Sequence, residues 1–212
     1  MRAALIDYGS GNIASAAKAL SRAASETSGH EIVVTADPDL VRKSERIILP
    51  GVGAFADCMR GLRAIPGMVE ALNESVIQGG KPILGICVGM QLMATAGREF
   101  GIHNGLNWIG GEVLAMQPAD PSLKIPHMGW NEIEPVQDHP LFAGLDANAN
   151  AYFVHSFEMK PDSAAHLLAT TSYGGPVTAA IGRDNIVGTQ FHPEKSQGVG
   201  LKILANFLNW KP

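Results

Sequence analysis

The sequence predicts an α/β fold, in which a mostly parallel central sheet is flanked by helices and the C-terminal half is more antiparallel. Three observations support this. Short apolar runs alternate with helix-like stretches over the first half of the chain, the pattern of a parallel sheet covered on both faces. After Gly105, turn residues become frequent and strand candidates become short. No repeat, linker or low-complexity tract divides the chain, so we expect a single domain over residues 1–212.

The first half supplies strands and helices in alternation. We expect strands at residues 3–6, 31–35, 46–49 and 82–86, and helices at residues 13–24, at residues 68–78 and from Cys87 onward. The first helix follows a turn-rich segment in which Ser10 or Asn12 could provide the N-cap. A Pro-Gly-Val-Gly segment ends the third strand, and two consecutive glycines end the second helix.

The second half supplies shorter elements joined by turns. We expect strands at residues 152–154, 165–171, 178–181 and 186–190. Residues 200–210 are predicted to form a closing amphipathic helix, because their apolar residues recur at helical spacing.

Composition argues against several classes of protein. With 16 Lys+Arg against 20 Asp+Glu and no basic run, a nucleic-acid-binding protein is not expected. Cys58 and Cys87 are too few for a disulfide framework or a Cys-rich zinc module. The longest apolar stretch, between Lys81 and Arg98, contains three Gly and one Gln and is shorter than the roughly 20 residues of a membrane-spanning helix. The N-terminus reaches Asp7 too early for a signal peptide. We therefore expect a cytoplasmic protein with reduced thiols.

Cys87 lies where a predicted strand runs into a predicted helix, in a Gly-x-Cys-x-Gly turn typical of a nucleophile elbow. Such a turn strains the backbone of the nucleophile, and side chains at Gly85 and Gly89 would collide. The N-terminus of the next helix would favour the thiolate, and the Val88 N–H could bind a developing oxyanion. Gln91 would share a helix face with Cys87. A cysteine in an apolar run is more often a small buried hydrophobe, and this is our interpretation of the other cysteine.

A cysteine nucleophile needs a base and a group that orients it. His192 and Glu194 follow a β-type run and could supply both, since Pro193 would hold the chain extended and let residues two apart project to one side. Alone, His-Pro-Glu is more typical of an ordinary surface turn. The tripeptide indicates a catalytic pair only together with the nucleophile-elbow motif around Cys87.

Two motifs together resemble those of the class I (triad) glutamine amidotransferases: Gly-Ile-Cys87-x-Gly-x-Gln91, and Phe191-His192-Pro193-Glu194. Further segments are similar to the glutaminase subunits of imidazole glycerol phosphate synthases within that family. They are residues 6–12, 49–55, 126–131, 152–157 and 192–197. Residues 95–109 are less similar, and no role is transferred to them.

The resemblance implies a role for each matching residue. Cys87 would be the nucleophile, His192 the general base and then acid, and Glu194 the orienting carboxylate. The substrate L-glutamine would meet an oxyanion strand and a binding group formed by Gly51, Val52, Gly53, Val88, Gln91, Ser156 and Phe157. No metal or organic cofactor is implied.

The resemblance also implies a partner, a separate (β/α)8-barrel cyclase subunit in a heterodimer, which would use the ammonia to make imidazole glycerol phosphate and AICAR. The positions expected at or near that contact are Asn12, His127, Met128, Trp130 and Tyr152. The aromatic clusters around Trp130 and Tyr152 fit a core equally well, but exposed aromatics in turn-rich segments would favour a partner surface.

The segment Pro50-Gly51-Val52-Gly53 would, alone, be typical of a plain turn, and it lacks the Gly-Lys-Ser/Thr of a phosphate loop. Because glycines allow peptide orientations denied to other residues, we hypothesise that a peptide reorients here to complete the oxyanion hole when the cyclase and its ligand bind.

Other functions fit parts of the pattern. A stand-alone Cys-His-Glu hydrolase, either a γ-glutamyl hydrolase or a cysteine peptidase, would be fully active by itself. A non-catalytic binding module with a decayed site is disfavoured because all three triad positions are filled. A glutaminase that serves pyridoxal phosphate synthesis has the same triad and differs only in the flanking segments.

Overall fold

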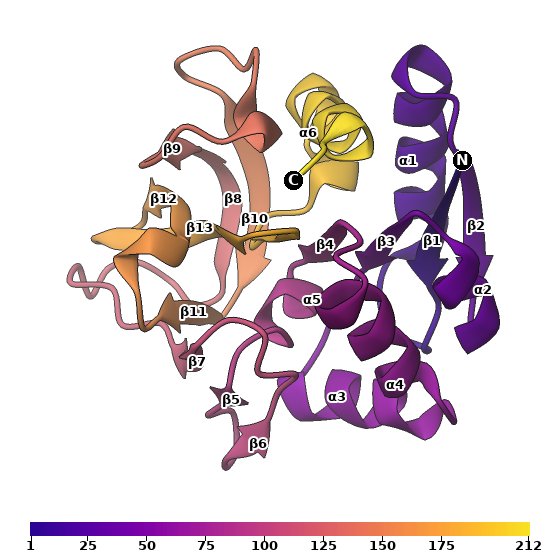
Figure 1. Ribbon diagram of the computed structural model, residues 1–212. Helices are drawn as coiled ribbons and strands as arrows, with labels where there is room; N and C mark the ends of the chain where they lie inside the picture. Colours follow the sequence, from indigo (N-terminus) through magenta and orange to yellow (C-terminus); the bar gives the residue numbers. More distant parts are fainter.

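The computed structural model describes residues 1–212 and is organised around an eight-stranded sheet with helices on both faces (Figure 1). The sheet order is β2-β1-β3-β4-β14-β13-β12-β9. These strands are β1 (Arg2–Ile6), β2 (Glu31–Thr35), β3 (Arg46–Leu49), β4 (Ile83–Ile86), β9 (Glu134–Pro135), β12 (Leu167–Ser172), β13 (Pro176–Arg183) and β14 (Ile186–Thr189). The pairs from β2 through β14 are parallel, and the remaining pairs are antiparallel. The predicted fold class is confirmed.

Helices cover both faces of the parallel strands. On one face α1 (Ile13–Thr27) packs against α6 (Gln197–Asn209), while α2 (Pro38–Lys43), α3 (Phe55–Ala64) and α4 (Met68–Asn73) gather on the other (Figure 1). The buried residues of α1 are Ala16, Leu20, Ala23 and Ala24, which lie on one side of the helix. Strands β1, β3 and β4 are almost wholly buried because both of their faces are covered.

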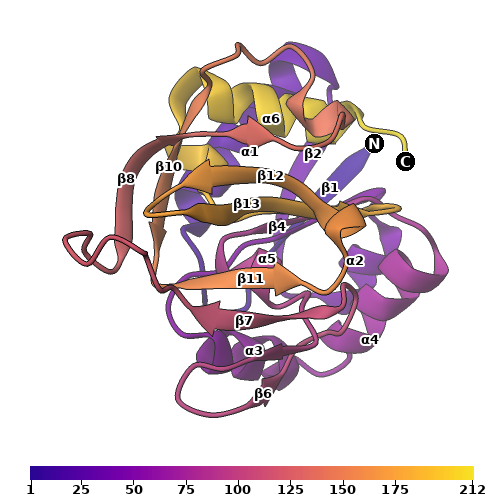
Figure 2. The same ribbon diagram turned by 90° about the vertical axis from the view of Figure 1, so that its left-hand side faces the viewer.

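Two smaller sheets flank the antiparallel end. An antiparallel ribbon joins β8 (His127–Glu132) to β10 (Asn150–His155), with Tyr152 opposite Trp130. The other sheet has the order β11-β7-β5-β6 and contains β5 (Ala96–Gly97), β6 (His103–Asn104), β7 (Gly111–Ala115) and β11 (Phe157–Pro161). Figure 2 shows the β8–β10 ribbon standing beside β12 and β13.

Several element predictions need correction. The helix expected at residues 68–78 is α4 followed by a π-helical turn, η1 (Glu74–Gln78), and the helix after Cys87 is only the short α5 (Val88–Gln91). The region expected as strand at 165–171 begins with a 3₁₀ turn, η3 (Ala164–His166), and another 3₁₀ turn, η2 (Pro140–Phe142), precedes β10. Helices α2 and α3 and strands β5, β6, β7, β8, β9 and β11 were not predicted. Asn12 occupies the N-cap position of α1, as one of the two predicted alternatives, but its side chain makes no capping hydrogen bond, and the Ser10 hydroxyl bonds to Val52 instead.

None of the helices combines the length and the apolar character that crossing a membrane requires.

Candidate active site

Cys87 stands at a strained turn between β4 and α5. Its backbone has φ 54° and ψ −114°, a conformation that residues other than glycine rarely adopt. A side chain at Gly85 would lie 2.7 Å from the Met90 backbone, and one at Gly89 would lie 1.9 Å from the Leu49 carbonyl oxygen. Both positions therefore require glycine. The backbone of Met90 excludes a side chain at Gly85, and the end of β3 excludes one at Gly89.

The α5 helix provides a weaker dipole at the Cys87 sulfur than the sequence suggested. It spans only Val88–Gln91, so its dipole is that of a single turn. The Gln91 N–H bonds to the Cys87 carbonyl oxygen over 3.1 Å, as expected for residues one turn apart.

Strand β14 brings the histidine to the cysteine. It pairs in parallel with β4, with Thr189 opposite Ile86, and the Cys87 N–H donates to the Thr189 carbonyl oxygen over 2.7 Å. His192 follows β14, and its own N–H donates to the Tyr152 carbonyl oxygen over 3.0 Å. The two residues of the proposed pair thus follow adjacent parallel strands.

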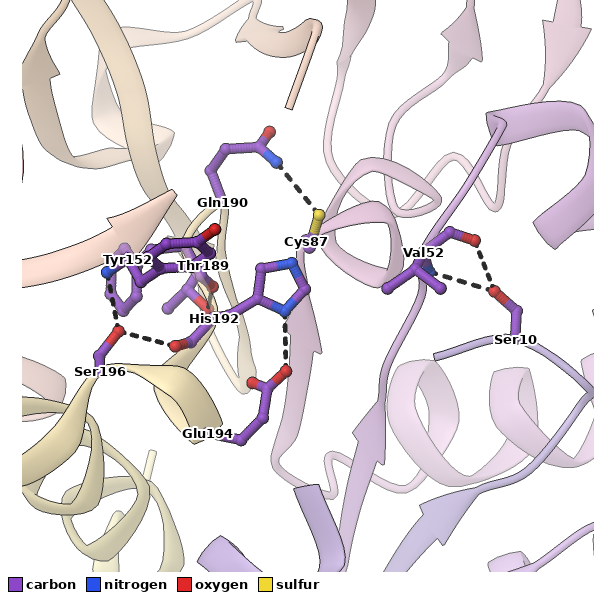
Figure 3. Close-up of polar contacts among 10 residues, drawn as sticks. Ser10, Val52, Cys87, Tyr152, Thr189, Gln190, His192, Glu194 and Ser196 are labelled. Carbon is purple, nitrogen blue, oxygen red and sulfur yellow. Dashed lines mark hydrogen bonds and ion pairs between the residues drawn. The ribbon is translucent and has the colours of Figure 1, made fainter. Parts of the chain in front are cut away.

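The Ser196 hydroxyl tightens this connection between β10 and the residues after β14. It donates to the His192 carbonyl oxygen over 2.7 Å and accepts from the Tyr152 N–H over 2.9 Å (Figure 3). The backbone that carries His192 is therefore fixed on both sides.

His192 and Glu194 form a buried ion pair. His192 Nδ1 lies 2.8 Å from Glu194 Oε1, and the two side chains are only 2% and 3% exposed (Figure 3). Burial alone would lower the pKa of His192, but hydrogen bonds and charge interactions with Cys87 and Glu194 raise it to about 9. The predicted extended chain at Pro193 is wrong, because Pro193–Lys195 is a 3₁₀ turn, η4, and this turn folds the carboxylate back onto the imidazole.

The backbone N–H predicted to bind an oxyanion already donates a hydrogen bond within the protein. The Val88 N–H donates to the Gly51 carbonyl oxygen over 3.3 Å. Upstream of this contact, the Tyr8 hydroxyl donates to the Pro50 carbonyl oxygen over 2.6 Å, and a side chain at Gly51 would lie 2.7 Å from the Gly89 nitrogen. The start of the segment is therefore fixed, whereas Val52 and Gly53 are exposed.

A cavity of about 570 Å³ opens in front of Cys87. Its walls bring together most of the predicted site residues, namely Asn12, Val52, Gly53, Cys87, Val88, Gln91, Ser156, Phe157 and His192. Gly51 and Glu194 lie behind this wall, around a smaller neighbouring gap. No group of three or more His, Cys, Asp or Glu side chains is arranged to hold a metal ion.

Gln190 is a site residue that the sequence analysis missed. Its Oε1 accepts from Gln91 Nε2 over 3.0 Å, and its Nε2 lies 3.7 Å from the Cys87 sulfur as a donor (Figure 3). Gln91 Nε2 also donates to the Phe157 carbonyl oxygen over 3.0 Å. Because Gln190 immediately follows β14, pairing of that strand with β4 could have found it, but no motif spacing did.

Two charged residues were also missed. Glu99 and Lys195 both line the cavity, and Glu99 comes from the region to which the resemblance assigned no role. Glu99 Oε2 accepts from the Phe55 N–H over 2.8 Å and so caps α3 from another loop. Lys195 Nζ lies 5.6 Å from the centre of the Tyr152 ring.

The residues predicted near a partner divide into two groups. Met128 and Trp130 are 61% and 47% exposed, and Tyr152 packs edge-on to Trp130 with ring centres 6.0 Å apart. His127 is fully buried and stacks on Phe153, so its side chain cannot itself touch a partner. The aromatic region is thus core on its inner side and surface on its outer side.

Comparison with known proteins gives consistent matches. Residues 4–210 match the family described as glutamine amidotransferase class-I. Over 100% of both chains, the sequence is 59% identical to the imidazole glycerol phosphate synthase subunit HisH of Rhodospirillum rubrum and 58% identical to that of Brucella suis. A solved structure of a glutamine amidotransferase, 16% identical, has the same fold, with a TM-score of 0.70 over 93% of this chain and 94% of that one.

Proposed function

Since the chain belongs to the class I glutamine amidotransferases, we propose that it hydrolyses L-glutamine to glutamate and ammonia and supplies the ammonia to a cyclase subunit in histidine biosynthesis. The observation that carries this proposal is the strained Cys87 beside the buried His192–Glu194 pair, at the wall of a cavity large enough for an amino acid. Residues 1–212 would act as one amidotransferase domain.

In the proposed reaction His192, whose pKa is raised by Cys87 and Glu194, takes up the Cys87 proton, and the sulfur then attacks the side-chain amide carbon of glutamine. The tetrahedral intermediate collapses when His192 gives that proton to the leaving nitrogen, so that ammonia departs and a γ-glutamyl thioester remains. Water, deprotonated by His192, then hydrolyses the thioester to glutamate and restores the thiol. Glu194 holds the imidazole through Nδ1 during both steps.

The side chains of the cavity support amino-acid binding. The Gln91 carboxamide directs its nitrogen to Phe157 and Gln190, which leaves its oxygen free to accept from the substrate. The Glu99 carboxylate places a negative charge in the wall where the α-ammonium group of glutamine could pair with it. Lys195 offers the opposite charge for the α-carboxylate.

The hydrogen bond of the Val88 N–H to Gly51 supports an enzyme whose activity depends on its partner. While Gly51 accepts from it, this donor is not available to an oxyanion, and a well-placed oxyanion donor is worth roughly 3–4 kcal/mol in acyl transfer. We propose that the Gly51–Val52 peptide turns over when the cyclase and its ligand bind. Free ammonia is lost to protonation in water, so hydrolysis that waits for the acceptor avoids waste.

The proposed partner is a (β/α)8-barrel cyclase subunit, bound as a heterodimer over the face that carries Met128, Trp130 and Tyr152. The identity over full length with relatives named as synthase subunits supports this partner. The acceptor products would be imidazole glycerol phosphate and AICAR. This chain would need no metal or organic cofactor for its own reaction.

The test is glutamate formation by the chain alone, then with a cyclase subunit and its nucleotide ligand, with Cys87→Ala as control. We expect weak activity alone, a large rise in the complex and none in the variant. Full activity alone would indicate a self-sufficient hydrolase instead.

A further inference from the structure

One peptide unit beside the nucleophile is hydrogen-bonded at both of its ends. The carbonyl oxygen of Gly51 accepts from the Val88 N–H over 3.3 Å, and the N–H of Val52 donates to Ser10 Oγ over 3.1 Å. These two groups belong to the same planar peptide and point in opposite directions. A bond at each end therefore fixes which side of the peptide faces the Cys87 turn.

The next peptide is held by the same side chain and by one more. Ser10 Oγ lies 2.8 Å from the Val52 carbonyl oxygen, to which it can donate, since a hydroxyl carries one proton and two lone pairs (Figure 3). Cys58 Sγ donates to that carbonyl oxygen over 3.2 Å and lies 3.1 Å from Ser10 Oγ. Burial raises the pKa of the Cys58 thiol, so it stays protonated and remains a donor at neutral pH.

Side-chain packing alone does not fix the conformation of Val52 and Gly53. The side chain of Val52 is 41% exposed, and a side chain at Gly53 would meet nothing within 4 Å. The upstream end is different, because Tyr8 bonds to Pro50 and Gly51 is closely packed. The only part free to turn is therefore the stretch whose polar groups Ser10 and Cys58 hold.

Ser10 and Cys58 reach Val52 from two separate elements. Ser10 belongs to the loop between β1 and α1, where it does not cap the helix. Cys58 lies on α3 and takes no part in the Cys87–His192–Glu194 group. Val52 is thus held between the loop and the helix.

We infer that Ser10 and Cys58 are positioning residues that keep the Gly51–Val52 peptide turned with its carbonyl oxygen towards Val88, and so keep the glutaminase activity of the isolated chain low. This inference rests on the proposed function. Turning the peptide over would free the Val88 N–H and direct the Val52 N–H towards the developing oxyanion, and it must first break the bond to Ser10 Oγ. After the turn the Ser10 hydroxyl can donate to Gly51, but it no longer holds the Val52 N–H, so its net effect favours the resting state.

The test compares Ser10→Ala with Ser10→Thr, which keeps the hydroxyl, and with Ser25→Ala, a matched loss of a hydroxyl at the exposed end of α1. We expect Ser10→Ala to raise kcat of the isolated chain about fivefold without changing KM, since one net hydrogen bond is removed from the resting state only. Ser10→Thr and Ser25→Ala should keep the wild-type kcat. In the complex with the cyclase and its ligand, all three should match the wild type, so the activation ratio of Ser10→Ala falls about fivefold.

Cys58 gives a second, independent pair of variants. Cys58→Ala removes a donor to Val52 and should raise the isolated kcat about twofold, whereas Cys58→Ser keeps the donor and should not. An unchanged or lower kcat of the isolated Ser10→Ala and Cys58→Ala chains, with a fully active complex, would overturn the inference. Failure of the proposed function looks different, because the wild-type complex itself would then release no glutamate.

Discussion

The Val88 N–H donates to the Gly51 carbonyl oxygen over 3.3 Å, so the backbone donor next to the proposed nucleophile is bonded within the protein. In this state the proposed base and carboxylate are paired beside the proposed nucleophile, yet the Val88 N–H is not available to an oxyanion. Assembly of the three side chains and availability of the donor are therefore separate properties of the site.

Gly53→Ala should impair turnover in the complex by roughly tenfold. Gly53 has φ +91° with open space around it, so an added methyl group meets no obstacle but restricts the backbone. The matched control is Gly80→Ala, which has φ +64°, equally open space and a place in the loop before β4. Both variants should lose about 1 kcal/mol of unfolding free energy, and only Gly53→Ala should lose kcat. Unchanged turnover of Gly53→Ala in the complex would contradict a mobile segment.

Gln190→Glu should lower kcat while leaving KM nearly unchanged. The glutamate keeps an oxygen to accept from Gln91 Nε2 but removes the amide donor 3.7 Å from the Cys87 sulfur and adds a negative charge there. Gln190→Leu should also raise KM, because Gln91 Nε2 loses one of its two acceptors and keeps only the Phe157 carbonyl oxygen. Gln137→Leu is the matched control, since Gln137 is exposed and bonds only to backbone carbonyl groups of η3 and the first residue of β12. The measurements are steady-state kinetics of the complex and the rate of Cys87 alkylation by iodoacetamide. Equal kinetics for Gln190→Glu and wild type would show that the amide donor is unimportant.

The local parts of this site could be predicted from the sequence. Glycines two residues on either side of Cys87 indicate a tight turn, and the His192–Glu194 spacing indicates a pair, although a 3₁₀ turn rather than an extended chain produces it. The strands of the parallel half were predictable because burial on both faces leaves long apolar runs.

The remaining parts depend on contacts between distant segments. Strand β14 pairs with β4, and this pairing brings His192 to Cys87. No local sequence pattern determines that strand order. Gln190 was missed, and Ser10 was given the wrong role, for the same reason, since their partners are far away in the sequence. Helix α3 was missed because its cap comes from Glu99 in another loop rather than from its own N-cap residue.

The His192–Glu194 pair should make stability depend on pH. The pKa of His192 is raised to about 9 in the folded chain, above its ordinary value of 6.5, by hydrogen bonds and charge interactions with Cys87 and Glu194. Its contribution to stability, on the order of 2–3 kcal/mol, is therefore complete below pH 6.5 and is lost as the pH rises towards 9. Glu194→Gln removes the carboxylate that supports the imidazolium, so its deficit in unfolding free energy should be largest near pH 6 and shrink by pH 9.5. Urea unfolding at both pH values measures this, and a deficit that does not change with pH would contradict it.

Trp130→Ser should weaken the complex with the cyclase subunit without lowering the stability of the isolated chain. Trp130 is 47% exposed and contacts Tyr152 across the β8–β10 ribbon, so it offers a large apolar area to a partner at little cost to the core. An aromatic residue at the centre of an interface is typically worth 2 kcal/mol or more, which corresponds to a loss of affinity of roughly thirtyfold. Ile77→Ser is the matched control, because Ile77 is 52% exposed on η1, outside this ribbon. Calorimetric titration of the cyclase subunit measures both affinities. Equal affinities for the two variants would place the interface elsewhere, and a large fall in unfolding free energy for Trp130→Ser would show that its ring belongs to the core.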